Sequence, residues 1–198
     1  VLASLSFVLA CDLNIDEAIE FSNFAAGVVV AKIGSSTATL NEIIEYESSL
    51  NKSFSEEHIK TLNEIISLCT ELKARGKRVV FTNGCFDLLH TGHVKYLDTA
   101  KSFGDVLILG LNSDRSATAL KGKERPINVQ ADRAYILAAL EVVDYVVIFD
   151  EDTPYELIKA IKPHILVKGG DYKGKEVVGQ DIADELKLVE FLDGKSST

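Results

Sequence analysis

The chain has 198 residues, of which 46% are hydrophobic and 26% charged, and its formal net charge at pH 7 is −9. This composition is typical of a globular protein, and no apolar run approaches the ~18 residues of a membrane span. The negative charge argues against broad binding to nucleic acid or to an anionic membrane. A site for a phosphate-rich ligand must therefore be a local concentration of Lys, Arg, His and backbone amides.

The three cysteines are Cys11, Cys69 and Cys85, and their spacing matches neither a set of metal ligands nor a disulfide framework. We therefore expect reduced thiols and a cytoplasmic protein. Residues 1–10 (VLASLSFVLA) are apolar, but they lack the basic leader and the cleavage site of a signal peptide. A buried helix is expected there instead.

Residues 1–46 are predicted to form two helices followed by an irregular tail. The second helix has Asn14 as its expected N-cap and Glu17 three residues later, and apolar residues then follow at helical spacing. The polar segment 45–55 suits a linker. A further helix is predicted from about residue 55 to residue 74, where apolar residues again recur at helical spacing before a glycine.

From Arg78 onward, short apolar strands alternate with helices. The predicted strands lie at 79–81, 106–111, within 142–149, at 165–167 and at 186–191, and the helices between them lie at about 92–102, at 131–140 and after a capping residue at Thr153. This alternation predicts an α/β fold, with a Rossmann-like parallel sheet of five strands, helices on both faces and an N-terminal helical appendage. Ligands bind to such sheets at the carboxyl ends of the strands, where the strand order reverses.

The segment after the first of these strands carries the strongest chemical signal. It has the sequence TNGCFDLLHTGH (residues 82–93) and leads into the next helix. Gly84 lets the backbone approach a phosphate closely, and the helix start offers unpaired N–H groups and a partial positive charge to an anion. Two imidazoles three residues apart, those of His90 and His93, can face the same anion.

This segment, with Gly84, Phe86-Asp87, His90 and Gly92-His93 at their spacing, resembles the first motif of the cytidylyltransferase-like nucleotidyltransferases. Its TNGCFD version is similar to the adenylyltransferase half of the bifunctional heptose-phosphate kinases and heptose 1-phosphate adenylyltransferases. The resemblance implies transfer of AMP from ATP to D-glycero-β-D-manno-heptose 1-phosphate. The products would be pyrophosphate and ADP-heptose, a precursor of bacterial lipopolysaccharide or surface polysaccharide. It also implies Mg²⁺ bound through the nucleotide phosphates, with no dedicated protein ligands.

Later segments extend the resemblance. Residues 112–126 and Arg133 are similar to the family's substrate loop and the helix after it. Residues 167–171 (VKGGD) are similar to the segment that meets the base and ribose. Residues 194–198 (GKSST) are similar to the family's closing phosphate-binding segment, from which this chain departs at Ser197. The implied catalytic residues are His90, His93 and Lys121. The implied nucleotide-binding residues are Asn83, Gly84, Cys85, Phe86, Gly92, Lys168, Gly169, Asp171, Ser196, Ser197 and Thr198. The implied substrate-binding residues are Asp87, Asn112, Asp114, Lys123, Arg125 and Arg133.

Two other functions remain open. The first is a cytidylyltransferase that acts on a polyol or alcohol phosphate; cytidylyl-transferring relatives usually place an arginine where this chain has Phe191, so the adenylyl branch is favoured. The second is a regulator that binds a nucleotide without turnover, against which the intact His90 and His93 argue.

Residues 1–46 resemble the last helices of a ribokinase-type sugar kinase, in the stretches 25–30 (AAGVVV) and 34–39 (GSSTAT). They are interpreted as a non-catalytic remnant, with the rest of a kinase domain preceding Val1 in the native chain. Residues 47–76 are interpreted as a linker and helix, and residues 77–198 as the nucleotidyltransferase domain. A homo-oligomer is expected, with ATP and a sugar 1-phosphate as ligands.

Overall fold

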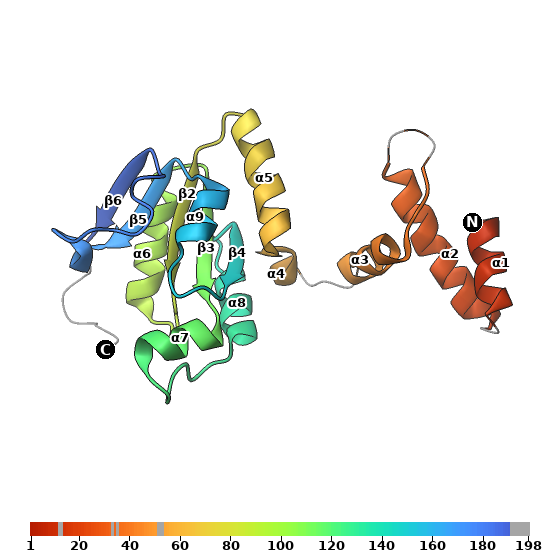
Figure 1. Cartoon of the computed structure of the whole chain (residues 1–198), viewed down its shortest axis with the longest axis horizontal. Coiled ribbons are helices and arrows are strands. Elements are labelled where there is room, and N and C mark those ends of the chain that lie inside the picture. Colours follow the sequence, from red (N-terminus) through yellow and green to blue (C-terminus); the bar gives the residue numbers. More distant parts are fainter. Residues whose placement is uncertain (12–13, 33, 35, 51–53, 191–198) are drawn as a thin grey trace. The chain divides into compact units, whose positions relative to one another are not determined.

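The structure is a computed structural model that describes residues 1–198 except 12–13, 33, 35, 51–53 and 191–198. It divides into two compact units, Val1–Ser53 and Phe54–Thr198 (Figure 1). Among the described residues, no helix combines the length and the apolar character needed to cross a lipid bilayer. The three cysteines are free, and two of them, Cys69 and Cys85, are buried.

The described part of the first unit contains the helices α1 (Leu2–Ala10), α2 (Ile15–Val30) and α3 (Leu40–Leu50). α2 begins at the predicted cap. The Asn14 side chain accepts a hydrogen bond from the Glu17 N–H at 2.9 Å, and the Glu17 carboxylate accepts one from the Asn14 N–H at 3.1 Å. These reciprocal bonds satisfy two amides that a helix start otherwise leaves unpaired.

α3 occupies a segment for which an irregular tail and a polar linker are predicted, and that prediction is wrong. Thr39 and Glu42 exchange side-chain to backbone hydrogen bonds of 2.8 and 3.3 Å, which cap the start of the helix. Ile43 then packs on Ala25 and Val28 of α2. A local capping pair and apolar packing on α2 thus stabilise this helix, and the polar composition of the segment obscured both signals in the sequence.

The second unit is built on a parallel sheet (Figure 1). Its strand order is β1-β4-β3-β2-β5-β6, and every adjacent pair is parallel. The strands are β1 (Ile59–Lys60), β2 (Val79–Gly84), β3 (Val106–Asn112), β4 (Tyr145–Phe149), β5 (Ile165–Gly169) and β6 (Glu185–Val189). The order reverses at β2, because β3 and β4 follow on one side of it and β5 and β6 on the other.

Helices cover both faces of this sheet, as predicted. Adjacent residues of β2 point to opposite faces, so Val80 and Phe81 belong to different apolar clusters. Val80 shares its cluster with residues of α6 (Thr91–Lys101) and α8 (Gln130–Ala138). Phe81 shares its cluster with residues of α5 (Leu62–Ala74) and α9 (Tyr155–Ile161).

Within the described residues the sheet has six strands and not the predicted five, because β1 interrupts the single helix predicted for residues 55–74. That segment forms α4 (Phe54–Glu57), then β1, then α5. Ile59 and Lys60 pair with β4, and Thr61 starts α5 by exchanging hydrogen bonds with Glu64. The helical spacing across β1 was coincidental, and α4, β1 and α5 belong to the compact unit that contains the sheet.

Two other elements differ from expectation. The predicted substrate loop contains the helix α7 (Asp114–Lys121), whose N-cap is Ser113. α9 begins at Tyr155, one residue later than predicted, with Pro154 at the cap position and no side-chain capping bond from Thr153. The apolar strand that follows α9 is where it is predicted.

Candidate active site

The end of β2 turns sharply into the segment that precedes α6. Phe86 adopts a positive φ of 44°, and its ring folds back over Gly84. A Cβ atom at Gly84 would lie 2.9 Å from that ring, so a larger residue would disturb the turn. The buried Phe86 ring also meets the His93 ring edge-on, with 5.4 Å between centroids. This turn thus places Phe86 against one of the two predicted catalytic histidines.

His90 and His93 are stacked at the start of α6, with ring centroids 4.0 Å apart. His90 is the N-cap of the helix, and its Nδ1 accepts a hydrogen bond from the Gly92 N–H at 3.1 Å. Because Nδ1 accepts, the neutral ring carries its hydrogen on Nε2. His90 Nε2 and His93 Nδ1 are buried, and neither has a hydrogen-bond partner among the residues that the structure describes. Buried polar atoms without partners are rare, so these two nitrogens mark a place for a ligand.

His93 is held in its neutral form. Burial, followed by the nearby charges of His90 and Lys121, lowers its pKa to about 4. At pH 7 the free protein therefore presents the uncharged imidazole of His93, stacked on the His90 ring, and the helix start to an incoming anion. The exposed Lys121, at the end of α7, supplies a positive charge close enough to act on His93 and on the thiol of Cys85. A phosphate group would find hydrogen-bonding groups beside the exposed cation of Lys121.

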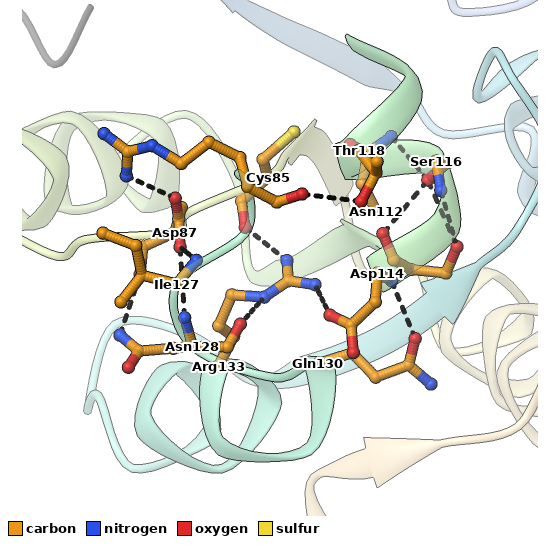
Figure 2. Close-up of polar contacts among 12 residues, drawn as sticks. Cys85, Asp87, Asn112, Asp114, Ser116, Thr118, Ile127, Asn128, Gln130 and Arg133 are labelled. Carbon is orange, nitrogen blue, oxygen red and sulfur yellow. Dashed lines mark hydrogen bonds and ion pairs between the residues drawn. The ribbon is translucent and has the colours of Figure 1, made fainter. Parts of the chain in front are cut away.

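Arg133, a predicted substrate residue, lies inside the protein with 1% of its surface exposed. Figure 2 shows its guanidinium between three segments of the chain. It donates to the carbonyl oxygens of Cys85 at 2.5 Å and Asn128 at 3.0 Å, and to the carboxylate of Asp114 at 2.7 Å. Arg133 therefore ties the turn after β2 to the start of α7 and to the loop before α8.

Asp87, also a predicted substrate residue, is 2% exposed and organises the same loop (Figure 2). Its carboxylate accepts hydrogen bonds from the Arg125 guanidinium at 2.6 Å and from the N–H of Ile127 at 2.7 Å. A longer bond of 3.3 Å comes from the N–H of Asn128. Burial alone would raise the pKa of Asp87, but these three donors outweigh it and hold the pKa below its ordinary value.

The contacts of Asp87 predict how acid affects stability. A carboxyl group whose pKa is depressed by folding stabilises the fold above its unfolded pKa of 3.8, and this contribution is lost as the pH falls through the lower folded pKa. Asp87→Asn should lower the free energy of unfolding by about 2 kcal/mol at neutral pH, because donors in a buried site lose their charged acceptor. The difference between wild type and variant should shrink below pH 3.8. Urea denaturation at several pH values measures it, and a difference independent of pH would contradict the role given to Asp87.

The other predicted substrate residues fall into two groups. The first is occupied within the fold: the buried Asn112 amide donates to the Ser116 hydroxyl at 3.1 Å, Asp114 pairs with Arg133, and Arg125 pairs with Asp87. The second is on the surface and contains Lys123, which is exposed in the loop after α7. Lys123 can thus meet a second substrate at the loop surface, whereas the residues of the first group hold the loop in place.

Lys168 and Asn83 face each other across the point where strand order reverses. Lys168 is on β5, only 6% exposed, and its ammonium group donates to the amide oxygen of Asn83 on β2. Burial lowers the pKa of Lys168 to about 8, and Asp171, in the short helix η1 (Gly170–Tyr172), acts in the opposite direction. The ammonium group also lies 5.4 Å from the centre of the Tyr172 ring. A buried cation that bonds no carboxylate in the part of the chain that the structure describes is suited to an anionic or polar ligand.

Some site residues lie outside these observations. The predicted phosphate contacts Ser196, Ser197 and Thr198, and Phe191, are outside the described residues. Gly92 and Gly169 lie where expected, in the first turn of α6 and at the end of β5. Sequence reasoning missed Tyr96, which is buried one turn after His93 and bonds to residues of β2 and β5. Its position three residues after His93 was the signal in the sequence that could have identified it.

Comparison with known proteins gives a consistent result. Residues 81–195, more than half of the chain, match the family model described as cytidylyltransferase-like. "Bifunctional protein HldE" of Aliarcobacter butzleri is 70% identical over 198 residues, which are all of this chain and 42% of that protein. The protein of the same name from a Nitratiruptor species is 64% identical, again over all of this chain and over 43% of that protein. The chain thus spans less than half the length of these curated relatives.

Solved structures show the same fold. The lipopolysaccharide core biosynthesis protein from Thermoplasma volcanium matches 60% of this chain and 99% of its own, with 29% identity and a TM-score of 0.51. Pantoate-beta-alanine ligase from Francisella tularensis, at 18% identity and a TM-score of 0.51, shares the fold over 67% of this chain and 66% of its own. The family match, the parallel sheet and the stacked histidines at the start of α6 agree, and the chain belongs to the cytidylyltransferase-like family.

Proposed function

We propose that the chain transfers AMP from ATP to D-glycero-β-D-manno-heptose 1-phosphate and releases pyrophosphate. The product, ADP-heptose, would serve lipopolysaccharide or surface polysaccharide synthesis in the cytoplasm. The observation that carries the enzymatic part is the pair of buried nitrogens, His90 Nε2 and His93 Nδ1, without partners among the described residues at a helix start. The names of the HldE relatives and of the Thermoplasma protein support the sugar pathway.

The chemistry requires positioning more than a general base. The attacking phosphate oxygen of the sugar 1-phosphate is already ionised at pH 7. It forms a bond to the α-phosphorus of ATP while the bond from that phosphorus to the α,β-bridging oxygen breaks and pyrophosphate leaves. The barrier lies in bringing two anions together and in stabilising charge on the α-phosphate in flight. His90, His93 and the start of α6 would donate hydrogen bonds to that phosphate, and Lys121 would offset its charge.

The other predicted contacts can be divided by their geometry. Asn83 and Lys168, with Gly169 and Asp171, would meet the ribose and base at the end of β5, and Gly84, Cys85 and Phe86 would line the phosphate turn. Lys123 would contact the sugar phosphate from the loop surface. Asp87, Asn112, Asp114, Arg125 and Arg133 would shape this loop by their bonds within the fold.

Other ligands and partners follow from the same proposal. In the described part of the chain, no group of three or more His, Cys, Asp or Glu side chains could hold a metal ion by itself. Phosphate oxygens are ligands that Mg²⁺ prefers, and we propose that it binds through them and neutralises charge on the nucleotide. Ser196, Ser197 and Thr198 would hold the outgoing phosphates.

The first unit would be the end of a sugar kinase domain in a longer native protein, which we propose to be a homo-oligomer.

The choice of base gives a direct prediction. A site that hydrogen-bonds one base edge leaves polar groups unpaired with another, so ATP should be used at least about 100-fold more efficiently than CTP. The experiment is a pyrophosphate-release screen of ATP and CTP against heptose 1-phosphate and a polyol phosphate. Comparable kcat/KM values for the two nucleotides would move the protein to the cytidylyl-transferring branch.

A further inference from the structure

β2 and β5 are joined by a backbone ladder that stops short of the candidate site. The ladder consists of two residue pairs, the second of which joins Phe81 to Leu166. On its other side, β2 pairs with β3 through all six of its residues. The residues that come next on β2 and β5 are Thr82 and Val167, which lie beyond this ladder. Another contact must therefore set the separation of these two strand ends.

The hydroxyl group of Tyr96 makes that contact. It donates a hydrogen bond to the carbonyl oxygen of Val167 at 3.2 Å and lies 2.7 Å from the Thr82 hydroxyl. Because a phenol has one hydrogen, the Thr82 hydroxyl is the donor in the second bond. Tyr96 is 8% exposed, and Thr82 and Val167 are fully buried. Burial raises the pKa of the Tyr96 phenol far above its ordinary value, so the group keeps its hydrogen at every working pH.

The two hydrogen bonds of the Tyr96 hydroxyl join β2 and β5 next to residues of the candidate site. The residue after Thr82 is Asn83, and the residue after Val167 is Lys168, which donates to the Asn83 amide. Tyr96 itself lies on α6, three residues after His93. One hydroxyl thus contacts both β2 and β5 and fixes the helix that carries the stacked histidines.

We propose that Tyr96 is a positioning residue for nucleotidyl transfer, and this rests on the adenylyltransferase function proposed above. Its hydroxyl holds the ends of β2 and β5, and the first turns of α6, where Asn83, Lys168 and His93 meet the nucleotide. Tyr96 touches no substrate and acts through these neighbours. Phenylalanine at this position keeps the ring and leaves two buried groups without a partner, so the strand ends separate and admit water.

The test uses Tyr96→Phe in the whole 198-residue chain. NMR titration without any ligand measures the pKa of Lys168, and pyrophosphate release measures kcat and KM. The pKa of Lys168 should rise from about 8 toward its ordinary 10.5, because water would reach the ammonium group, whose pKa burial lowers in the wild type. kcat should fall about 10- to 100-fold, since small misplacements of catalytic groups have effects of that size.

Two further variants separate positioning from stability. Tyr145→Phe removes the hydroxyl of a partly buried tyrosine on β4. In this variant the pKa of Lys168 and kcat should stay at wild-type values. Tyr96→Phe combined with Thr82→Val leaves no threonine hydroxyl unpaired, so it should recover thermal stability without recovering kcat or the low pKa of Lys168. Wild-type turnover and an unchanged Lys168 pKa in Tyr96→Phe would overturn the proposal. If wild type itself releases no pyrophosphate, the adenylyltransferase function fails, and the Lys168 pKa still decides the role of Tyr96.

Discussion

Replacing His93 with alanine is expected to lower kcat for pyrophosphate release about 10²- to 10³-fold, while the affinity for ATP changes much less. The loss of one preorganised donor to a reacting group typically has this effect, roughly 3–4 kcal/mol in the barrier. His93 Nδ1 is buried without a partner among the described residues, and a pKa of about 4 makes the ring a neutral hydrogen-bonding group. Charge on the α-phosphate changes during transfer, so the interaction stabilises the transition state more than bound ATP.

Comparison with His90 tests whether His93 has only a structural role. The N-cap of α6 is His90, so a capping function does not account for His93. His90→Asn keeps a good N-cap but loses the Nε2 donor, whereas His90→Ala loses both. We expect reduced turnover in both His90 variants and reduced stability mainly in His90→Ala, as measured by circular dichroism during heating. Near-normal kcat in His93→Ala and His93→Asn, with the fold intact, would remove His93 from the mechanism.

Arg133→Met is expected to reduce the free energy of unfolding by about 3–5 kcal/mol, the largest effect on stability among these predictions. Methionine replaces the buried apolar stem but leaves the carbonyl oxygens of Cys85 and Asn128 without a donor and breaks the pair with Asp114. The turn that leads to His90 would lose its link to α7, so turnover should fall as well.

Arg115→Met is the matched control for Arg133. Arg115 also contacts carboxylates, those of Asp150 and Asp152, but all three side chains are exposed, and ion pairs in water contribute little. Urea denaturation of the two variants should therefore show a large loss for Arg133→Met and a small one for Arg115→Met. Equal losses would mean that Arg133 does not hold the turn in place.

The parts of the fold that follow from local chemistry are predictable from the sequence. Buried parallel strands such as 106–111 are continuous apolar runs, and the glycine turn with two histidines (residues 82–93) has the spacing that carries the family resemblance. The sheet, the helices on its two faces and the family are confirmed.

Some of the features that were missed depend on partners far away in the sequence. β1 has two residues and exists because Ile59 and Lys60 pair with β4, more than 80 residues away in the sequence. Asp87 and Arg133 are predicted from the sequence to bind the substrate, and only the packed structure shows that they face inward and bond to the backbone. Tyr96 fits an ordinary amphipathic helix, and its role depends on where β2 and β5 meet.

Identification of the product tests the central claim most directly. The 198-residue chain would be incubated with ATP, Mg²⁺ and D-glycero-β-D-manno-heptose 1-phosphate, and the mixture analysed by mass spectrometry, with His93→Ala as the inactive control. We predict equal amounts of ADP-heptose and pyrophosphate from wild type, and very little of either from the variant. Binding of ATP without any nucleotide sugar, or hydrolysis of ATP to ADP and orthophosphate, would contradict the account.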